Sequence, residues 1–573
     1  MFFGNGHIAL PPLKPFSGLV MPQVIWQQGI LNMQANKDWW KSTVIYQIYP
    51  RSFQDSNNDG IGDLPGITRR LPHIAELGAE AIWISPFFTS PMADFGYDVS
   101  DYCDVDPMFG TLQDFRELVA RAHALGLKVL IDLVLSHTSD QHPWFVESRS
   151  SRDNPRADWY VWADARVDGT PPNNWLSLFG GSAWQWDARR GQYYLHNFLT
   201  SQPDLNFHQP AVQEAVLEVA RFWLQLGVDG FRLDTVNFYT HDARLRDNPP
   251  QPAGQYAGGV PRSNPYAFQR HLYDKTQPEN LLFIQRLRQL CDEFAAITVG
   301  EIGDDQQYRT LCDYTAGEQR LHMAYVFTLL TEQCQPRYLH GVLAEYLREA
   351  GDATVCWALS NHDNIRVVSR WAALGGSEQA RARTFAALLL SLPGPVCLYQ
   401  GEELGLPEAE VPYALLQDPY GKVLWPEYKG RDGCRTPMPW EDSAAGGFGS
   451  TAPWLPLAAS HRPLAVASQQ QPDSTLACWR QLLAWRRQQP ALLSGRLQLH
   501  AADEQLLQFD RVHPQQRLRC LFNLSPEACS VPLPAGGQLL GDSGFAAPLQ
   551  DGVLQLAPMS AVFVSLPLEP SHV

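Results

Sequence analysis

The sequence has few of the features that mark disulfide-linked, zinc-binding or nucleic-acid-binding proteins. Its ten cysteines form no C-x-x-C pair and keep no regular spacing, so we expect reduced, mostly buried thiols. Basic residues are also scarce, since 44 Lys and Arg stand against 60 Asp and Glu, a formal net charge of −16. A nucleic acid or an anionic membrane would favour a basic surface. We therefore expect neither as a partner.

Long hydrophobic runs and processing signals are missing as well. No apolar run approaches the roughly 18 residues that a membrane helix needs. Residues 1–36 contain four prolines and lack a basic start followed by an apolar block, so they do not resemble a signal peptide. We expect residues 1–36 to be a poorly ordered extension, or the product of a start upstream of Met33, and the protein to be cytoplasmic. No Ser–His–Asp or Cys–His arrangement and no phosphate loop stands out.

Predicted strands and helices alternate along most of the 573 residues. Apolar, β-branched and aromatic runs predict strands at Val44–Tyr49, Ala81–Ser85, Lys128–Leu135, Phe231–Val236, Ile297–Ile302, Val355–Leu359 and Val396–Tyr399. Amphipathic patterns predict helices at Ile67–Leu77, Leu112–Leu125, Gln213–Leu226, Pro278–Phe294 and Ser377–Leu392. Seven or eight such units imply an α/β fold, the closed (β/α)8 TIM barrel.

Two segments interrupt this alternation. Residues 138–206 contain six tryptophans with Pro, Gly and Asp and no clear helix, so we expect an insertion lobe, domain B, after the third strand. Short strand-like segments separated by turns predict a C-terminal antiparallel β domain at 496–573. The barrel itself would then span residues 37–137 and 207–495.

The segment Gly227–Asn237 places an arginine and an aspartate at the end of one predicted strand. Arg232 and Asp234 are two residues apart, so their side chains point to the same face of a strand. A buried guanidinium group beside Asp234 would keep this carboxylate ionised and oriented, as a covalent nucleophile requires. A purely structural ion pair would give the same pattern, so this segment alone does not decide between the two.

Acidic residues and histidines also follow several other predicted strands. They are Tyr97 and Asp98 after the second strand, Asp132 and His137 at the third, Glu301 in the fifth, and Ser360–Asn364 after the sixth. In such a barrel, groups at the strand ends converge on one opening. Positions on five separate strands are hard to explain as ion pairs alone, so we interpret them as an active site.

These residues lie in motifs that resemble those of the α-amylase superfamily, glycoside hydrolase family 13. Within it the chain resembles the α-glucosidases of the oligo-1,6-glucosidase subgroup, from Trp39 to about residue 500. The segments similar to the family motifs are Asp132–His137, Gly230–Asp234, Val299–Ile302 and Ser360–Asp363, and Gln202–Asn206 is similar to the subgroup signature. One departure is Ser136, where the family usually has Asn. It concerns a supporting contact and not His137 itself.

The resemblance implies a retaining double displacement at two carboxyl groups in unlike environments. Asp234 would attack the anomeric carbon and form a glucosyl enzyme. Glu301 would protonate the leaving oxygen and then deprotonate the incoming water. Asp363 would hold sugar hydroxyls and favour the distorted, oxocarbenium-like ring.

The resemblance also implies a set of substrate-binding residues, namely Tyr97, Asp98, His137, Arg232, Thr235, His362 and Arg431. The two histidines would donate hydrogen bonds to hydroxyls of one glucose. Asp98 and Arg431 would close the far end of the site, so that glucose leaves from the non-reducing end. In relatives, the residue after the nucleophile is Val in α-1,6-preferring enzymes and Thr in α-1,4-preferring ones. Thr235 therefore favours maltose-like α-1,4 substrates.

The segment Asp55–Asp63 carries oxygen side chains at alternate positions, like the start of an EF-hand loop. Position 12 of such a loop would be Gly66 and not Glu, so the segment is not an EF-hand. It is similar to the Ca²⁺ or Mg²⁺ loop of the glucosidase subgroup, and the implied ligands are Asp55, Asn57, Asp59 and Asp63 through side chains and Ile61 through its carbonyl. The ion would be structural and not catalytic. An Asx-rich turn without an ion is the alternative.

Three functions remain open at this point. The first is a hydrolase of short α-glucosides, with possible transglucosylation. The second is a sucrose- or trehalose-converting glucosyltransferase or isomerase of the same fold. The third, a catalytically inactive transporter subunit, is disfavoured because the chain keeps Asp234, Glu301 and Asp363 and shows no membrane anchor. The expected partner is a small oligosaccharide or glucoside, and the oligomeric state, monomer or dimer, is not predicted.

Overall fold

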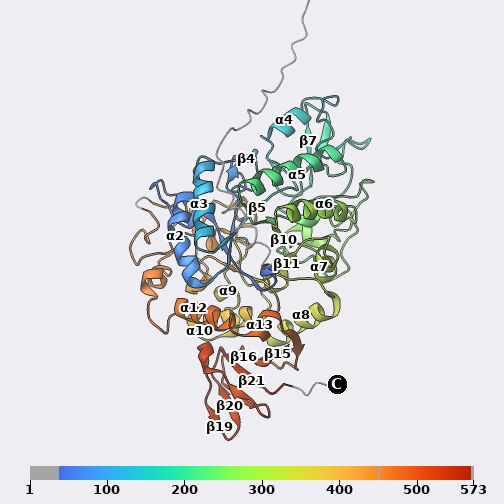
Figure 1. Ribbon diagram of the computed structural model, residues 1–573. Coiled ribbons are helices and arrows are strands. Elements are labelled where there is room, and N and C mark those ends of the chain that lie inside the picture. The colour runs from blue at the N-terminus through green and yellow to red at the C-terminus, as the bar shows by residue number, and fades with distance from the viewer. Residues whose placement is uncertain (1–37, 450–451, 569–573) are drawn as a thin grey trace, which may run out of the picture. The chain divides into compact units, whose positions relative to one another are not determined.

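The computed structural model describes residues 38–449 and 452–568, so the predicted extension at 1–36 lies outside the described residues. A sheet of eight strands, among them the labelled β5, β10 and β11, lies at its centre (Figure 1). The strands follow the order β11–β10–β9–β5–β2–β1–β13–β12 and are all paired in parallel. A further parallel bridge joins Ala324 in β11 to Val355 just before β12. This bridge closes the sheet on itself, so the predicted (β/α)8 barrel is confirmed.

The barrel strands are short and buried. They are β1 (Val44–Ile48), β2 (Ala81–Ile84), β5 (Lys128–Leu133), β9 (Gly230–Leu233), β10 (Ile297–Ile302), β11 (Met323–Val326), β12 (Trp357–Ala358) and β13 (Val396–Tyr399). Every residue in them is buried except the first residue of β5. Strands covered on both faces need nearly continuous apolar sequence, which explains why most of them were predicted.

Most helices of the barrel bury one face, whereas the helix Glu378–Ser391 is buried over most of its length. The main ones are α2 (Leu64–Leu77), α3 (Leu112–Ala124), α5 (Pro210–Gln225), α6 (Asn280–Glu293), α7 (Gln307–Thr315), α8 (Pro336–Glu349) and α10 (Glu378–Ser391). Helix α3 shows how the sequence starts such a helix and directs one face to the core. Thr111 and Asp114 cap its first turn reciprocally, and Phe115 and Leu118 are buried in the core. Burial of each such side chain contributes roughly 1.5–3 kcal/mol.

The structure corrects several strand predictions. Strand β11 was not predicted, because Met323–Val326 has only four residues and no turn signal marks its end. Strand β9 ends at Leu233, whereas the prediction extended to Val236. The reason is Thr235, whose φ of 40° lies in the left-handed region and turns the chain into a short 3-10 helix.

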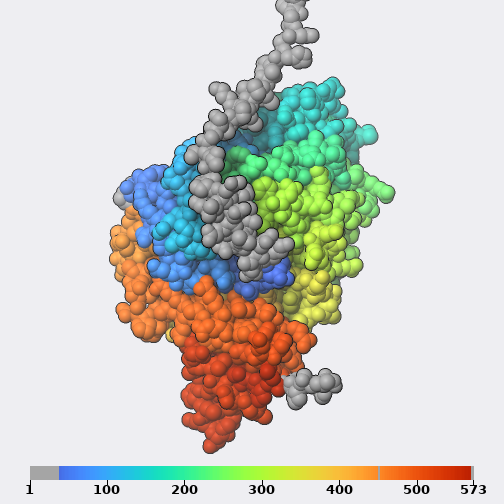
Figure 2. Space-filling model, in the orientation of Figure 1, coloured from blue at the N-terminus to red at the C-terminus, as the bar shows by residue number. Residues whose placement is uncertain are grey.

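Two smaller parts accompany the barrel. After β5 come α4 (Pro143–Ser148) and a sheet ordered β6–β8–β7 (Trp162–Ala163, Gln192–Leu195, Trp184–Asp187). Near the C-terminus, β14, β15, β16, β21 and β18 (Arg496–Leu499, Leu506–His513, Gln516–Asn523, Ser560–Leu566, Gln538–Leu539) form an antiparallel sheet. These C-terminal strands, red in Figure 2, lie next to the orange segment that ends the barrel. Both parts lie within the predicted lobes, whose limits at 138–206 and 496–573 stay predictions.

The state of the cysteines and the character of the helices match two expectations from the sequence. All ten cysteines are free, and seven of them are buried, as predicted. Among the described residues, no helix combines the length and the apolar character needed to cross a membrane.

Candidate active site

Arg232 on β9 holds three carboxylates together at the C-terminal end of the barrel. Its Nη1 lies 2.8 Å from Asp132 Oδ1 and 2.6 Å from Asp234 Oδ1, and its Nη2 lies 2.6 Å from Glu301 Oε2. Nη2 also donates a hydrogen bond of 2.6 Å to the hydroxyl of Tyr325. The predicted pair of Arg232 and Asp234 is therefore present. Its extension to Asp132 and Glu301 depends on β5, β9 and β10 being neighbours, which the sequence does not show.

Burial gives the two central carboxyl groups unusual acidities. Burial raises the pKa of Asp234 to about 6, although Arg232 acts in the opposite direction. Burial raises the pKa of Glu301 to about 7, again against Arg232 and with a further contribution from the Asp234 charge. Near neutral pH, Asp234 is thus mainly ionised while Glu301 retains much of its proton. The prediction that Arg232 keeps Asp234 ionised needs this correction, because burial outweighs the effect of Arg232 on the pKa of Asp234.

Thr235 connects the two carboxyl groups. Its backbone N–H donates to Glu301 Oε2 at 3.0 Å, and its hydroxyl donates to Asp234 Oδ2 at 3.2 Å. The same hydroxyl lies 3.1 Å from Ser136 Oγ, which in turn lies 2.9 Å from His137 Nδ1. Ser136 thus supports His137 directly, although it departs from the family pattern at this position.

Asp363 lies among positively charged groups. Its Oδ1 is 3.2 Å from Arg431 Nη1 and 2.8 Å from Arg435 Nη2. Burial by itself would raise the pKa of Asp363. The groups around it, His362, Arg431 and Arg435, outweigh burial and hold this pKa below its ordinary value. Asp363 therefore remains ionised when Glu301 is protonated.

The structure corrects the prediction that Asp98 closes the site with Arg431. Asp98 is fully buried and accepts hydrogen bonds from the Ser90 hydroxyl and from the backbone N–H groups of Ala93 and Asp94, so it shapes its own loop. Asp94 pairs with Arg431 instead, at 2.7 Å. The sequence alone could not separate these two aspartates, because they are four residues apart on one irregular segment.

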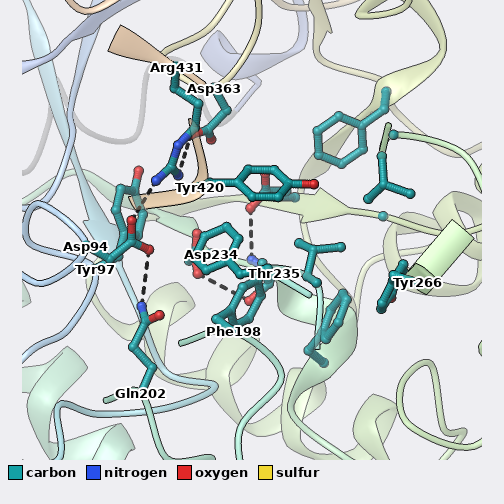
Figure 3. A pocket seen from close by; sticks show the side chains of 18 of the residues that line it. Asp94, Tyr97, Phe198, Gln202, Asp234, Thr235, Tyr266, Asp363, Tyr420 and Arg431 are labelled. Atoms are coloured by element: carbon teal, nitrogen blue, oxygen red, sulfur yellow. Dashed lines mark hydrogen bonds and ion pairs between the residues drawn. The ribbon is translucent and has the colours of Figure 1, made fainter. Parts of the chain in front are cut away.

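One cavity of about 170 Å³ joins these groups. Predicted site residues on its wall are Tyr97, His137, Asp234, Thr235, Glu301, Asp363 and Arg431. The wall also contains residues that the sequence did not indicate as site residues, namely Asp94, Phe179, Phe198, Gln202, Phe238, Tyr266, Lys275, Phe327, Tyr420 and Tyr428. In Figure 3, Asp94 and Tyr97 lie on one side of Asp234 and Tyr266 lies on the other.

Arg232 and His362 lie behind this wall. His362 is fully buried, and its Nε2 lies 2.5 Å from the Tyr97 hydroxyl and 3.2 Å from Asp363 Oδ2. Its ring also stacks on Tyr97, with 5.4 Å between the ring centroids. His362 therefore positions Tyr97 and Asp363, whereas the prediction had it donate directly to a sugar hydroxyl.

The predicted metal loop folds as a series of Asx turns. Asp55 accepts hydrogen bonds from the N–H groups of Asn57, Asn58 and Gly60, and the side chain of Asp63 caps α2 through Gly66. No group of three or more His, Cys, Asp or Glu side chains in the described ranges is arranged to hold a metal ion. All side-chain donors of the loop are nonetheless oxygen or amide groups, the hard ligands that Ca²⁺ and Mg²⁺ prefer.

The chain matches known proteins along most of its length. Residues 47–495 match the model of the alpha amylase catalytic domain, and residues 494–563 match a domain of unknown function, DUF3459. A "Probable alpha-glucosidase" of Rhizobium meliloti (strain 1021) is 58% identical over 540 residues, which cover 93% of this chain and 98% of the relative. An "Oligo-1,6-glucosidase" of Parageobacillus thermoglucosidasius is 35% identical over 532 residues, covering 87% and 92%.

Solved structures agree with this assignment. The α-glucosyl transfer enzyme XgtA superposes with a TM-score of 0.90 at 55% identity, covering 92% of this chain and 99% of that one. The trehalulose synthase MutB of Pseudomonas mesoacidophila MX-45 superposes with a TM-score of 0.83 at 32% identity, with the same coverage. The chain thus belongs to the α-amylase family of glycoside hydrolases, glycoside hydrolase family 13, among relatives named α-glucosidase and oligo-1,6-glucosidase.

Proposed function

We propose that this protein is a retaining, exo-acting α-glucosidase of short α-glucosides, with Asp234 as nucleophile and Glu301 as acid and base. The observation that carries the proposal is the contact of both carboxylates with the single guanidinium group of Arg232. Such a contact requires the two carboxyl groups to lie close together. Retaining glycosidases have a short separation of about 5–5.5 Å, whereas inverting ones leave room for a water molecule.

The proposed reaction has two steps. In the first, an Asp234 carboxylate oxygen attacks the anomeric carbon while Glu301 gives its proton to the leaving oxygen, so one C–O bond forms as the other breaks. In the second, Glu301 removes a proton from water, whose oxygen displaces Asp234 from the same carbon. Two inversions retain the α configuration. The higher pKa of Glu301 supports its role as proton donor, and the lower pKa of Asp234 supports its role as nucleophile.

The polar end of the cavity supports release of single glucose units. Arg431 joins Asp94 to Asp363 across this end, and Gln202 Nε2 lies 3.2 Å from both Asp94 Oδ2 and His137 Nε2. Charged and amide groups at fixed positions suit the hydroxyls of one terminal sugar. A longer chain would have to leave through the opposite side, past Asp234, so we propose attack at the non-reducing end.

Thr235 is the basis for the proposed linkage preference. Its hydroxyl faces the nucleophile and lines the cavity, so it lies where the bond to be cleaved must bind. We propose that α-1,4 glucosides such as maltose are preferred over α-1,6 glucosides. The likeness to the α-glucosyl transfer enzyme XgtA supports transfer to acceptors other than water as a second outcome of the same glucosyl enzyme. The likeness to a trehalulose synthase keeps sucrose isomerisation as the alternative.

We further propose that the loop Asp55–Asp63 binds a structural Ca²⁺ or Mg²⁺. Its oxygen-only donor set supports this assignment, although several of its oxygens already accept backbone N–H groups. The ten free thiols suit a reducing compartment, so we propose a cytoplasmic location.

Incubation with maltose, isomaltose, sucrose and trehalose, with the products followed by NMR, tests the function. We expect glucose from maltose, with a higher kcat/KM than for isomaltose. A higher kcat/KM for isomaltose would remove the linkage proposal, and conversion of sucrose to an isomer without net hydrolysis would favour the alternative. An Asp234→Asn variant that keeps wild-type kcat would exclude Asp234 as nucleophile.

A further inference from the structure

Lys275 is a buried lysine on the cavity wall for which the described residues provide no direct ion pair with a carboxylate. The residue is 8% exposed, and its Nζ donates a hydrogen bond of 2.8 Å to the carbonyl of Gly303. The ammonium group lies 4.9 Å from the ring centre of Phe238 and 5.6 Å from that of Tyr266. Against the effect of burial, the charge of Lys275 helps to hold the pKa of the buried Asp274 carboxyl below its ordinary value, but among the described residues no Asp or Glu side chain forms a direct ion pair with Lys275. Lysines are rarely buried this far without a direct ion pair, since the desolvated charge is costly.

The environment of Lys275 differs from that of Arg431, the other described cationic side chain on the cavity wall. Of the lysine and arginine side chains in the described parts of the chain, Lys275 and Arg431 line the cavity. Arg431 contacts three carboxylates, those of Asp94, Asp363 and Asp418. Its charge is thus fully matched within the protein. Lys275 uses one N–H donor for a carbonyl and leaves two donors for a bound molecule.

Lys275 lies on the side of the cavity where the leaving group must bind. Its ring neighbour Tyr266 is separated from Asp94 and Tyr97 by Asp234 (Figure 3). Its hydrogen-bond partner Gly303 follows the proposed acid Glu301 by two residues. The glucose hydroxyls would contact the Asp94 side, so Lys275 faces the group attached to the glucose.

We propose that Lys275 forms an aglycone site for a carboxylate, so that α-glucosides whose aglycone carries a carboxylate group are substrates of this enzyme. The inference rests on the proposed α-glucosidase function. Two free N–H donors match the two oxygens of a carboxylate, and such charge-assisted hydrogen bonds are the strong ones. The aromatic rings around Lys275 disfavour a doubly charged phosphate, whose desolvation would cost more. The ammonium group would also offset repulsion between the bound carboxylate and ionised Asp234.

The test compares 4-carboxyphenyl α-D-glucopyranoside with its neutral amide, 4-carbamoylphenyl α-D-glucopyranoside. The quantity measured is the ratio of the two kcat/KM values, in wild type and variants, because intrinsic leaving-group differences cancel between enzymes. We expect Lys275→Met to lower this ratio about tenfold or more. Lys275→Arg should retain most of it. Lys422→Met removes a charge from an exposed lysine outside the cavity and should leave the ratio unchanged.

A measurement on the wild type keeps the test valid if Lys275→Met does not fold. 4-Hydroxybenzoate should inhibit maltose cleavage at a lower concentration than 4-hydroxybenzamide, because only the benzoate can pair with the ammonium group. An equal loss for both glucosides in Lys275→Met, or equal inhibition by the benzoate and the benzamide, would overturn the inference. If the wild type cleaves neither compound nor maltose, the proposed function fails instead. Calorimetry of 4-hydroxybenzoate against 4-hydroxybenzamide then decides the inference, with tighter benzoate binding expected.

Discussion

Replacing Thr235 with valine removes one hydroxyl beside the proposed nucleophile and keeps the branched shape of the side chain. The lost hydroxyl donates to Asp234 Oδ2 at 3.2 Å. Hydrogen bonds to charged groups contribute about 1.5–3 kcal/mol, and this distance is long, so we take the lower end. The Thr235→Val variant should therefore lose about tenfold in kcat/KM for maltose, the factor that corresponds to about 1.4 kcal/mol.

The same substitution should change two further observables. Asp234 loses a donor that favours its ionised form, so its pKa should rise above the present value of about 6. The acid limb of the kcat/KM profile then moves to higher pH. The ratio of isomaltose to maltose cleavage should also rise, because the polar group that we propose to favour α-1,4 linkages is gone.

Ser136 provides the matched control for this prediction. Its hydroxyl lies 3.1 Å from Thr235 Oγ1 and 2.9 Å from His137 Nδ1, so the two hydroxyls act in one hydrogen-bond chain. In a double-mutant cycle, Thr235→Val should cost less in a Ser136→Ala background, with a coupling of about 0.5 kcal/mol or more. Additive effects, together with an unchanged acid limb and linkage ratio, would refute the role given to Thr235.

Three further predictions concern other parts of the site. The profile of kcat/KM against pH should be bell-shaped with limbs near pH 6 and pH 7. Below about pH 6 Asp234 is protonated, and above about pH 7 Glu301 has lost its proton. A flat profile from pH 4 to 9 would contradict these assignments. Arg431→Gln should lower the free energy of unfolding by about 3–5 kcal/mol, because the buried carboxylates of Asp94 and Asp418 lose their ion-pair partner while the partly exposed Asp363 keeps Arg435, and a thermal melt with an unchanged midpoint would count against this. Chelation should lower the melting temperature with little change in kcat if the loop Asp55–Asp63 holds an ion, and complete insensitivity to chelator and added Ca²⁺ or Mg²⁺ would count against the metal.

The barrel could be predicted because buried parallel strands leave a continuous apolar signal. Lys128–Leu133 is one such run, and every residue after the first is buried. Strand β11 shows the limit of such strand prediction, since the four residues Met323–Val326 carry no pattern that distinguishes a strand from a buried helix segment. The end of β9 shows a second limit of prediction from sequence. The turn at Thr235 depends on a left-handed backbone conformation, which cannot be predicted from a threonine at this position.

The active-site carboxylates could be predicted because they lie in motifs of contiguous residues. Their environment could not, since it comes from contacts between distant segments. Arg232 contacts Glu301 only because β9 and β10 are neighbours in the barrel. The aromatic side chains of the wall lie on irregular segments and on short helices such as Pro419–Leu424, and Lys275 lies on an irregular segment, all without a sequence signature. The confusion of Asp98 with Asp94 has the same origin, because only the path of the loop decides which carboxylate reaches Arg431.

The central claim is that Asp234 forms a covalent glucosyl enzyme, and trapping that species tests it most directly. Incubation with 5-fluoro-α-D-glucosyl fluoride should slow the second step and let the intermediate accumulate. After proteolysis, mass spectrometry should find the sugar on the peptide that contains Asp234, and maltose should compete with labelling. Labelling of any other residue, or full turnover with no labelled peptide under conditions that block the second step, would contradict the account.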